Sequence, residues 1–195
     1  MYGYDAPKTN AQLAADAEFM EKARDSSDGS LEASTLKAIA LGWTYFGRGD
    51  LATSMKRFNQ AYLLDPAHGE AYAGMAVVVL QRGGSTDEAY GLFQRAISSP
   101  ILTYTVHRNY GLFLMRQNRY LDALAQFDAA LELDPEIYGL RFMRAGLLDE
   151  LGRADESRQE IQRACEGANR SGNYVGRPET DMPRATCAEV GVPLD

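Results

Sequence analysis

Apolar residues recur along this chain at helical spacing, and the same arrangement returns after a fixed interval. Within residues 41–66, two apolar segments flank a Gly-Asp turn, and the second segment ends in Asp-Pro. This pattern predicts two short helices folded against each other. Gly42 and Gly111 are 69 residues apart, and so are Phe58 and Phe127. An offset of about two 34-residue periods predicts a repeat array in which neighbouring helix pairs share one core.

The spacing divides the chain into an arm, four repeats and a tail. The arm, residues 1–34, contains a predicted helix at residues 10–24. The tail, residues 167–195, is rich in glycine and proline and predicts loops, with a short turn around residues 184–189. The four repeats are predicted at about 35–68, 69–103, 104–137 and 138–166.

Residues 35–166 resemble four tetratricopeptide repeats. The resemblance rests on the small residues where the paired helices cross, the inward-facing Phe58 and Phe127, and the Asp-Pro endings. The segment SMKRFNQAYLLDP, with AYAGMAVVV after it, is also similar to small bacterial repeat proteins that are often exported or lipid-anchored. The resemblance implies an all-α, right-handed solenoid, with an extra N-terminal helix and a loop-rich tail. It also implies that the first helices line a concave groove that binds peptides or helices.

The resemblance assigns groove positions to the second, fifth, ninth and twelfth residues of each first helix. Most of these positions are apolar here, and Trp43 and Phe46 are expected to be the anchors. Ile39 and Trp43 stand where repeats that bind chaperone tails carry a basic residue and an asparagine, so that ligand class is not expected. The predicted groove residues are Leu36, Ile39, Trp43, Phe46, Val77, Leu80, Arg108, Leu112, Met115 and Phe142.

An apolar strip of this size usually marks a binding site. Three occupants remain open: a helix or peptide of a partner, the chain's own helix at residues 10–24, or a second copy of the chain. That helix could equally do no more than cap the first repeat. We therefore predict a protein–protein interaction module, an adaptor or assembly factor. The alternative is a self-associating structural subunit of a cell-envelope assembly, such as a pilus or secretion accessory. Sixteen arginines against four lysines favour a bacterial source.

Composition and motifs exclude several other functions. The net charge is −7 and the basic residues form no run, so nucleic acid is not an expected partner. The longest apolar run, residues 75–80, is too short to cross a bilayer. His68 and His107 have no Cys or Glu at ligand spacing, and no catalytic constellation is evident. We expect no enzyme activity, no metal and no cofactor.

Compartment and cysteine pairing are linked questions. The N-terminus carries no signal-peptide pattern, but the resemblance favours a periplasmic or outer-membrane-anchored protein, with the cytoplasm as the alternative. Cys165 and Cys187 fit no zinc or redox motif. They are either two separate thiols or one disulfide that pins the tail and implies an oxidising compartment.

Overall fold

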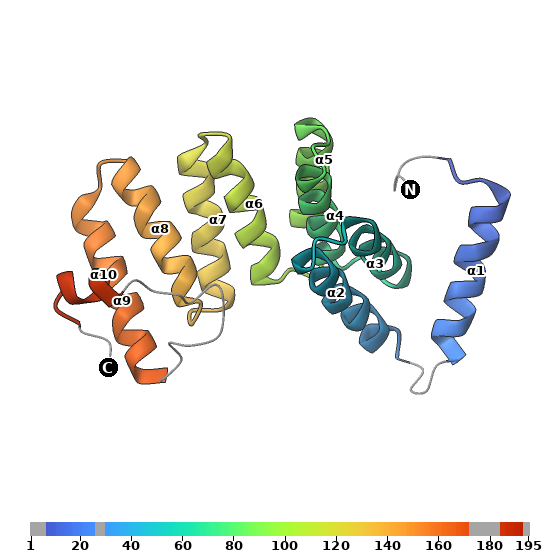
Figure 1. Cartoon of the computed structure of the whole chain (residues 1–195), viewed down its shortest axis with the longest axis horizontal. Coiled ribbons are helices and arrows are strands. Elements are labelled where there is room, and N and C mark those ends of the chain that lie inside the picture. The colour runs from blue at the N-terminus through green and yellow to red at the C-terminus, as the bar shows by residue number, and fades with distance from the viewer. Residues whose placement is uncertain (1–6, 26–29, 172–183, 193–195) are drawn as a thin grey trace. The chain divides into compact units, whose positions relative to one another are not determined.

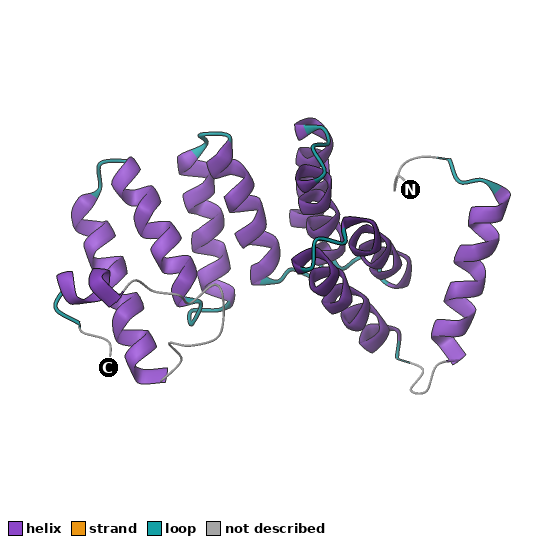
Figure 2. Ribbon diagram, viewed as in Figure 1, coloured by secondary structure: helices purple, strands orange, loops and turns teal. Residues whose placement is uncertain are grey.

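Helices joined by short turns make up the described part of the chain (Figure 2). The computed structural model describes residues 7–25, 30–171 and 184–192. The chain divides into two compact units, Met1–Leu102 and Thr103–Asp195.

The first unit contains an extra N-terminal helix and two helix pairs (Figure 1). Its helices are α1 (Asn10–Asp25), α2 (Leu31–Gly47), α3 (Leu51–Leu64), α4 (Gly69–Gln81) and α5 (Thr86–Ile97). α2 packs on α3 and α4 packs on α5, while α3 and α4 join one pair to the next. This arrangement confirms the helix-turn-helix organisation that the repeated pattern predicts.

Turn chemistry sets the ends of the paired helices. Gly49 adopts a φ of +78°, a left-handed conformation that glycine tolerates without steric cost. The next residue, Asp50, caps α3 by accepting a hydrogen bond from the backbone N–H of Thr53 at 3.0 Å. That bond holds the pKa of Asp50 below its ordinary value, because it favours the ionised carboxylate. Ser85 caps α5 in the same way, accepting from the backbone N–H of Asp87.

The core of the first unit is built around Phe58, which is fully buried. A β-carbon on Gly42 of α2 would lie only 2.6 Å from the Phe58 ring, and one on Gly74 of α4 would also collide with it. Side chains larger than hydrogen therefore cannot occupy these two positions without moving the ring. One phenylalanine thus explains why α2, α3 and α4 cross so closely.

The second unit repeats the design. Its helices are α6 (Tyr104–Arg116), α7 (Tyr120–Leu133), α8 (Tyr138–Glu150), α9 (Ala154–Ser171) and α10 (Arg184–Glu189). α6 packs on α7, and α8 packs on α9. Phe127 is fully buried, and a β-carbon on Gly111 would lie 2.5 Å from its ring, which reproduces the contact between Phe58 and Gly42.

The C-terminal end differs from the sequence-based expectation. α9 continues to Ser171, whereas the glycine-rich composition predicts that the loop-rich tail begins at residue 167. Gly167 acts here as a packing position, because a β-carbon on it would collide with the ring of Tyr138. Tertiary packing therefore overrides the low helix propensity of glycine. The expected turn at residues 184–189 is the short helix α10, and the loop expected over residues 172–183 lies outside the described residues.

Candidate functional site

Four of the predicted groove residues lie on α2, at spacings of three and four residues. Such spacing places them on one side of the helix. Leu36 is 49% exposed, and Trp43 and Phe46 are partly buried. Ile39 is only 5% exposed and belongs to the hydrophobic core beside α1. Ile39 therefore lies in the core under this side of α2, while Leu36, Trp43 and Phe46 are at least partly exposed to solvent.

The indole of Trp43 is fixed between α2 and α4. Its Nε1–H donates a hydrogen bond of 2.7 Å to the Oε1 atom of Glu70, a residue of α4 that is 9% exposed. The ring also makes edge contacts with Phe58 and Phe46, at centroid distances of 4.9 and 6.0 Å. Because the only donor of the indole is satisfied inside the protein, the partly exposed remainder of the side chain is apolar.

The neighbouring helix α4 carries two further predicted groove residues. Val77 and Leu80 are both partly buried and lie three residues apart on α4. α2 and α4 are in contact, so the predicted groove positions of the first two repeats lie on adjacent helices. We call this set the α2–α4 surface; it consists of Leu36, Trp43, Phe46, Val77 and Leu80.

The predicted groove residues of the second unit are less clearly grouped. Arg108, Leu112 and Met115 lie on α6, and each is partly buried. Phe142 of α8 packs against the cluster that α8 and α9 form around Tyr138. α6 and α8 each contact α7. A groove along this unit stays a prediction.

Helix α1 packs on the first repeat through its C-terminal half. Phe19, Met20 and Ala23 belong to the same apolar cluster as Ala38 of α2 and Leu64 of α3. The helix predicted at residues 10–24 is therefore present, and it contacts α2 and α3.

The side of α2 that faces α1 differs from the side that carries the α2–α4 surface. A concavity of about 390 Å³ between α1, α2 and α3 is lined on α2 by Ala33, Lys37 and Leu41. Ser34 and Ala38 also line this concavity, and at about 100° per residue the five positions centre about 165° around the helix axis from Leu36, Trp43 and Phe46. The concavity thus lies away from the α2–α4 surface, whereas Ile39 and Trp43 pack in the same apolar cluster as Phe19 and Met20 of α1. A capping role for α1 stays a prediction.

A second and larger concavity, of about 840 Å³, lies between α1 and α3. Its apolar lining comes chiefly from Phe19 of α1 and from Leu51, Met55 and Leu63 of α3. Sequence reasoning missed this site, because its existence depends on the angle at which α1 docks. Besides the core residues around Phe58, α3 carries a second set of apolar residues, Leu51, Met55 and Leu63, at intervals of four and eight. This set was the one signal of the site that the sequence offered.

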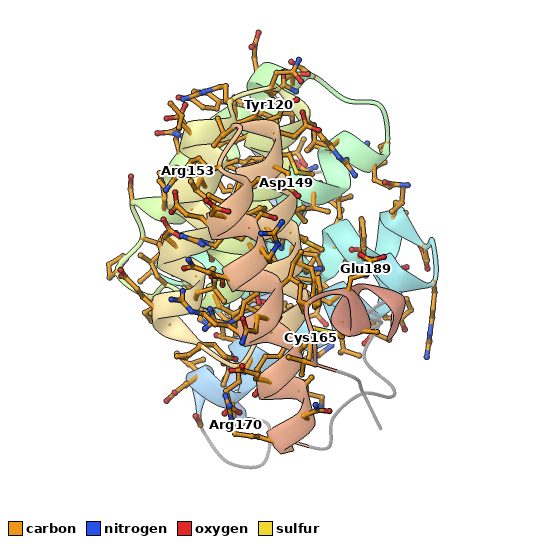
Figure 3. All side chains as sticks on the ribbon, turned by 90° about the vertical axis from the view of Figure 1, so that its left-hand side faces the viewer. Tyr120, Asp149, Arg153, Cys165, Arg170 and Glu189 are labelled. Atoms are coloured by element: carbon orange, nitrogen blue, oxygen red, sulfur yellow. A yellow bond between two sulfur atoms is a disulfide. The ribbon has the colours of Figure 1, made fainter. Side chains whose placement is uncertain are left out.

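Cys165 of α9 and Cys187 of α10 form a disulfide, with Cα atoms 5.7 Å apart. Both side chains are fully buried. Figure 3 shows α10, marked by Glu189, lying against α9 near Cys165. Of the two alternatives that the sequence leaves open, the structure thus contains the disulfide, and the bond attaches α10 to the end of the last repeat.

An ionic network around the buried Glu160 joins α7, α8 and α9. Glu160 is 2% exposed and accepts hydrogen bonds from Arg141 at 2.6 Å and from Arg144 at 3.2 Å. Arg144 also donates to Asp128 at 2.6 Å. Each of these groups has its charge partner within the fold, so the network is structural in character.

The two histidines lie in different units of the chain. Nδ1 of His107 lies 2.9 Å from Oε1 of Gln126, and His68 is buried between the two repeats of the first unit. Across residues 7–25, 30–171 and 184–192, no three His, Cys, Asp or Glu side chains gather in a way that could hold a metal ion. Among the helices that the structure describes, each is too short or too polar to span a membrane.

The fold places this chain in the class of all-α repeat proteins built from stacked helix pairs. The sequence pattern of the tetratricopeptide repeat family matches residues 39–100 and 111–173, and the chain belongs to that family. Its members act as protein–protein interaction modules and are generally not enzymes, and this is the broad class of function that the family assigns to the chain.

Solved structures agree on the fold. The crystal structure of MamA is 16% identical, with a TM-score of 0.58, and the match covers 87% of this chain and 100% of MamA. PilF of Pseudomonas aeruginosa is 21% identical, with a TM-score of 0.60, over 83% of this chain and 78% of that one. YrrB, described as a tetratricopeptide repeat protein with an unusual peptide-binding site, is 16% identical, with a TM-score of 0.53, over 90% and 92% of the two chains. A comparison with curated proteins finds no significant match.

Proposed function

We propose that this protein is an adaptor or assembly factor of bacteria that binds an apolar helix or peptide along the α2–α4 surface. The observation that carries the proposal is the state of Trp43. Its N–H is held by Glu70, its ring is buttressed by Phe58, and its apolar remainder stands beside Phe46 on a partly exposed surface. Large aromatic side chains that are already held in place make strong interface anchors, because little side-chain entropy is lost on binding.

The expected ligand is an amphipathic helix with basic residues at its edges. Leu36, Val77 and Leu80 supply apolar positions on two adjacent helices, which suits the i, i+3, i+4, i+7 face of a partner helix. The protein carries a net charge of −7, which favours encounter with a basic ligand. The likeness to YrrB, whose description names a peptide-binding site, is compatible with this ligand class.

The proposed location is an oxidising compartment, the periplasm or the outer membrane as an anchored protein. The support is the buried Cys165–Cys187 disulfide, because such bonds persist in oxidising compartments and are rare in the cytosol. Thiol titration of unfolded, unreduced protein taken from its native compartment should find no free thiol. Two free thiols per chain would overturn this location.

The binding proposal can be tested with a labelled model peptide. The probe is a helix-forming peptide of about 16 residues, with leucines along one face and lysines on both flanks. Fluorescence anisotropy should show saturable binding that Leu36→Glu weakens about tenfold or more, because the substitution places a charge on the apolar contact. Leu121→Glu is the matched control: Leu121 is 68% exposed on α7, in the other unit of the chain, and its substitution should leave binding unchanged.

Three results would overturn the proposal: the absence of saturable binding, an equal loss with both substitutions, or an equal affinity for a peptide of scrambled sequence. Sedimentation velocity over a range of protein concentrations separates the alternative, a self-associating subunit. In that case the mass rises with concentration and Leu36→Glu returns the protein to a monomer. Under our proposal the free protein keeps a constant mass.

A further inference from the structure

The larger concavity beside α1 is a site separate from the α2–α4 surface. It is a trough of about 840 Å³ whose floor is one side of α3, with the apolar Leu51, Met55 and Leu63 and the polar Asn59 between the last two. Phe19 of α1 forms the opposite apolar wall. None of the residues of the α2–α4 surface lines it, so the two sites can be altered independently.

The trough has the dimensions of a helix-binding site. Leu51 and Leu63 are twelve residues apart, which corresponds to a stripe of about 18 Å, or three helical turns. The trough is only about half enclosed by protein, so a thin acyl chain would stay partly exposed in it. The side chains of one face of a helix would fill it, because they project from a rod that the open side can accommodate.

The wall formed by α1 is held at one end. Its apolar contacts with the first repeat come from Phe19, Met20 and Ala23, in the C-terminal half of the helix. In the N-terminal half, Leu13 is 52% exposed although it is the largest apolar side chain there. A helix anchored in this way can adjust its distance from α3 when the trough is filled, because few buried contacts resist the movement.

The charges around the trough differ from those of the whole protein. Lys56 lies on the α3 side of the trough, and its side chain is exposed. On the α1 side the carboxylates are matched: Glu18 pairs with Lys22 and Asp16 pairs with Lys8, each at 2.5 Å. The rim is therefore locally cationic at Lys56 in a chain whose net charge is −7.

We infer that the trough between α1 and α3 binds an amphipathic helix of a partner protein, with its apolar face on Leu51, Met55 and Leu63 and acidic residues opposite Lys56. The trough is a second site beside the α2–α4 surface of the proposed function. It selects an acidic ligand, whereas the α2–α4 surface selects a basic one. A module with two such sites connects a basic helix at the α2–α4 surface to an acidic helix at the trough.

The test uses the full chain and two labelled peptides of about 14 residues that share a leucine face. One peptide carries glutamates on its flanks and the other carries lysines. Fluorescence anisotropy should show saturable binding of the acidic peptide that Lys56→Glu weakens about tenfold, because an attraction is replaced by a repulsion. Leu63→Gln should weaken binding to a similar degree by removing an apolar contact from the trough, since Leu63 is only partly buried.

Two control variants test whether binding of the acidic peptide depends on the trough itself. Arg158→Glu makes the same change of charge on an exposed side chain of α9, and it should leave binding of the acidic peptide unchanged. Leu36→Glu alters the α2–α4 surface and should also have no effect on the acidic peptide. Circular dichroism of each variant verifies that the fold is intact.

Several results would overturn the inference. The first is a failure of the acidic peptide to saturate the full chain. The second is an equal loss with Lys56→Glu and Arg158→Glu, which would indicate attraction to charge without a site. The third is a loss with Leu36→Glu, which would place the acidic peptide on the α2–α4 surface. The lysine peptide is the comparison that reports on the α2–α4 surface, so the acidic peptide can fail to bind the trough while the proposed function stands.

Discussion

Removal of the Phe58 ring tests the arrangement of the repeats most severely. The ring is fully buried, and two of its neighbours, Gly42 and Gly74, are glycines on different helices. Glycine has no side chain that could move into the space left by Phe58→Ala. The cavity should therefore stay largely open, and the cost of the substitution should be about 4 kcal/mol, within the range found for buried phenylalanines.

The matched comparison is Phe46→Ala. Phe46 is partly buried on the α2–α4 surface and contacts Trp43 by an edge of its ring. Its removal takes less apolar area out of the fold and leaves no closed cavity, so it should cost about 1–2 kcal/mol. The difference in stability cost between Phe58→Ala and Phe46→Ala depends directly on which side of the helix pair each residue occupies.

The assay is equilibrium unfolding in urea, followed by the fluorescence of Trp43 and by circular dichroism. Trp43 is the only tryptophan and lies 4.9 Å from the ring of Phe58, so its emission reports the first unit. Thermal melts should show a decrease in Tm of about 8–16 °C for Phe58→Ala in a chain of this size. A loss below about 1 kcal/mol, or an equal loss for Phe46→Ala, would refute the reasoning.

Three further predictions concern the ionic network, the disulfide and the N-terminal helix. Glu160→Gln should lower the free energy of unfolding in urea by about 3 kcal/mol, because two arginines lose their buried charge partner. Glu156→Gln, which breaks an exposed ion pair, should change stability little. Equal effects of the two substitutions would contradict a structural network. Cys187→Ala should lower the free energy of unfolding of the second unit by about 3 kcal/mol in the chain-entropy model. It should also release α10, which would then show faster hydrogen exchange. Unchanged exchange would show that α10 is held without the disulfide. Deletion of residues 1–24 should lower Tm while the emission maximum of Trp43 hardly moves, because the indole is held by Glu70 and Phe58 and does not line the concavity beside α1. A red shift would instead indicate that α1 covers the groove.

Local patterns were enough to predict the helix pairs. The small residue at 42 and the phenylalanine at 58 are read from one repeat and return at 111 and 127, so each repeat supports the interpretation of the other. Asp50 could be assigned as a cap because its role depends only on the next three residues.

Contacts between distant residues could not be predicted in the same way. The hydrogen bond from Trp43 to Glu70 joins residues 27 positions apart, and no local pattern pairs them. The burial of Ile39 depends on the core beside α1, although its repeat position predicts the groove. Gly167 has the composition of a loop, and only the ring of Tyr138 above it explains why the helix continues.

The central claim, that a partner binds along the α2–α4 surface, is tested most directly by the indole N–H signal of Trp43 in a ¹⁵N-correlated NMR spectrum. The chain has one tryptophan, so one indole signal reports the hydrogen bond to Glu70. On titration with the lysine-flanked model peptide, this signal should shift progressively and saturate in step with binding measured by anisotropy, and Leu36→Glu should abolish both changes. A peptide that binds the chain while the indole signal stays fixed would contradict the claim.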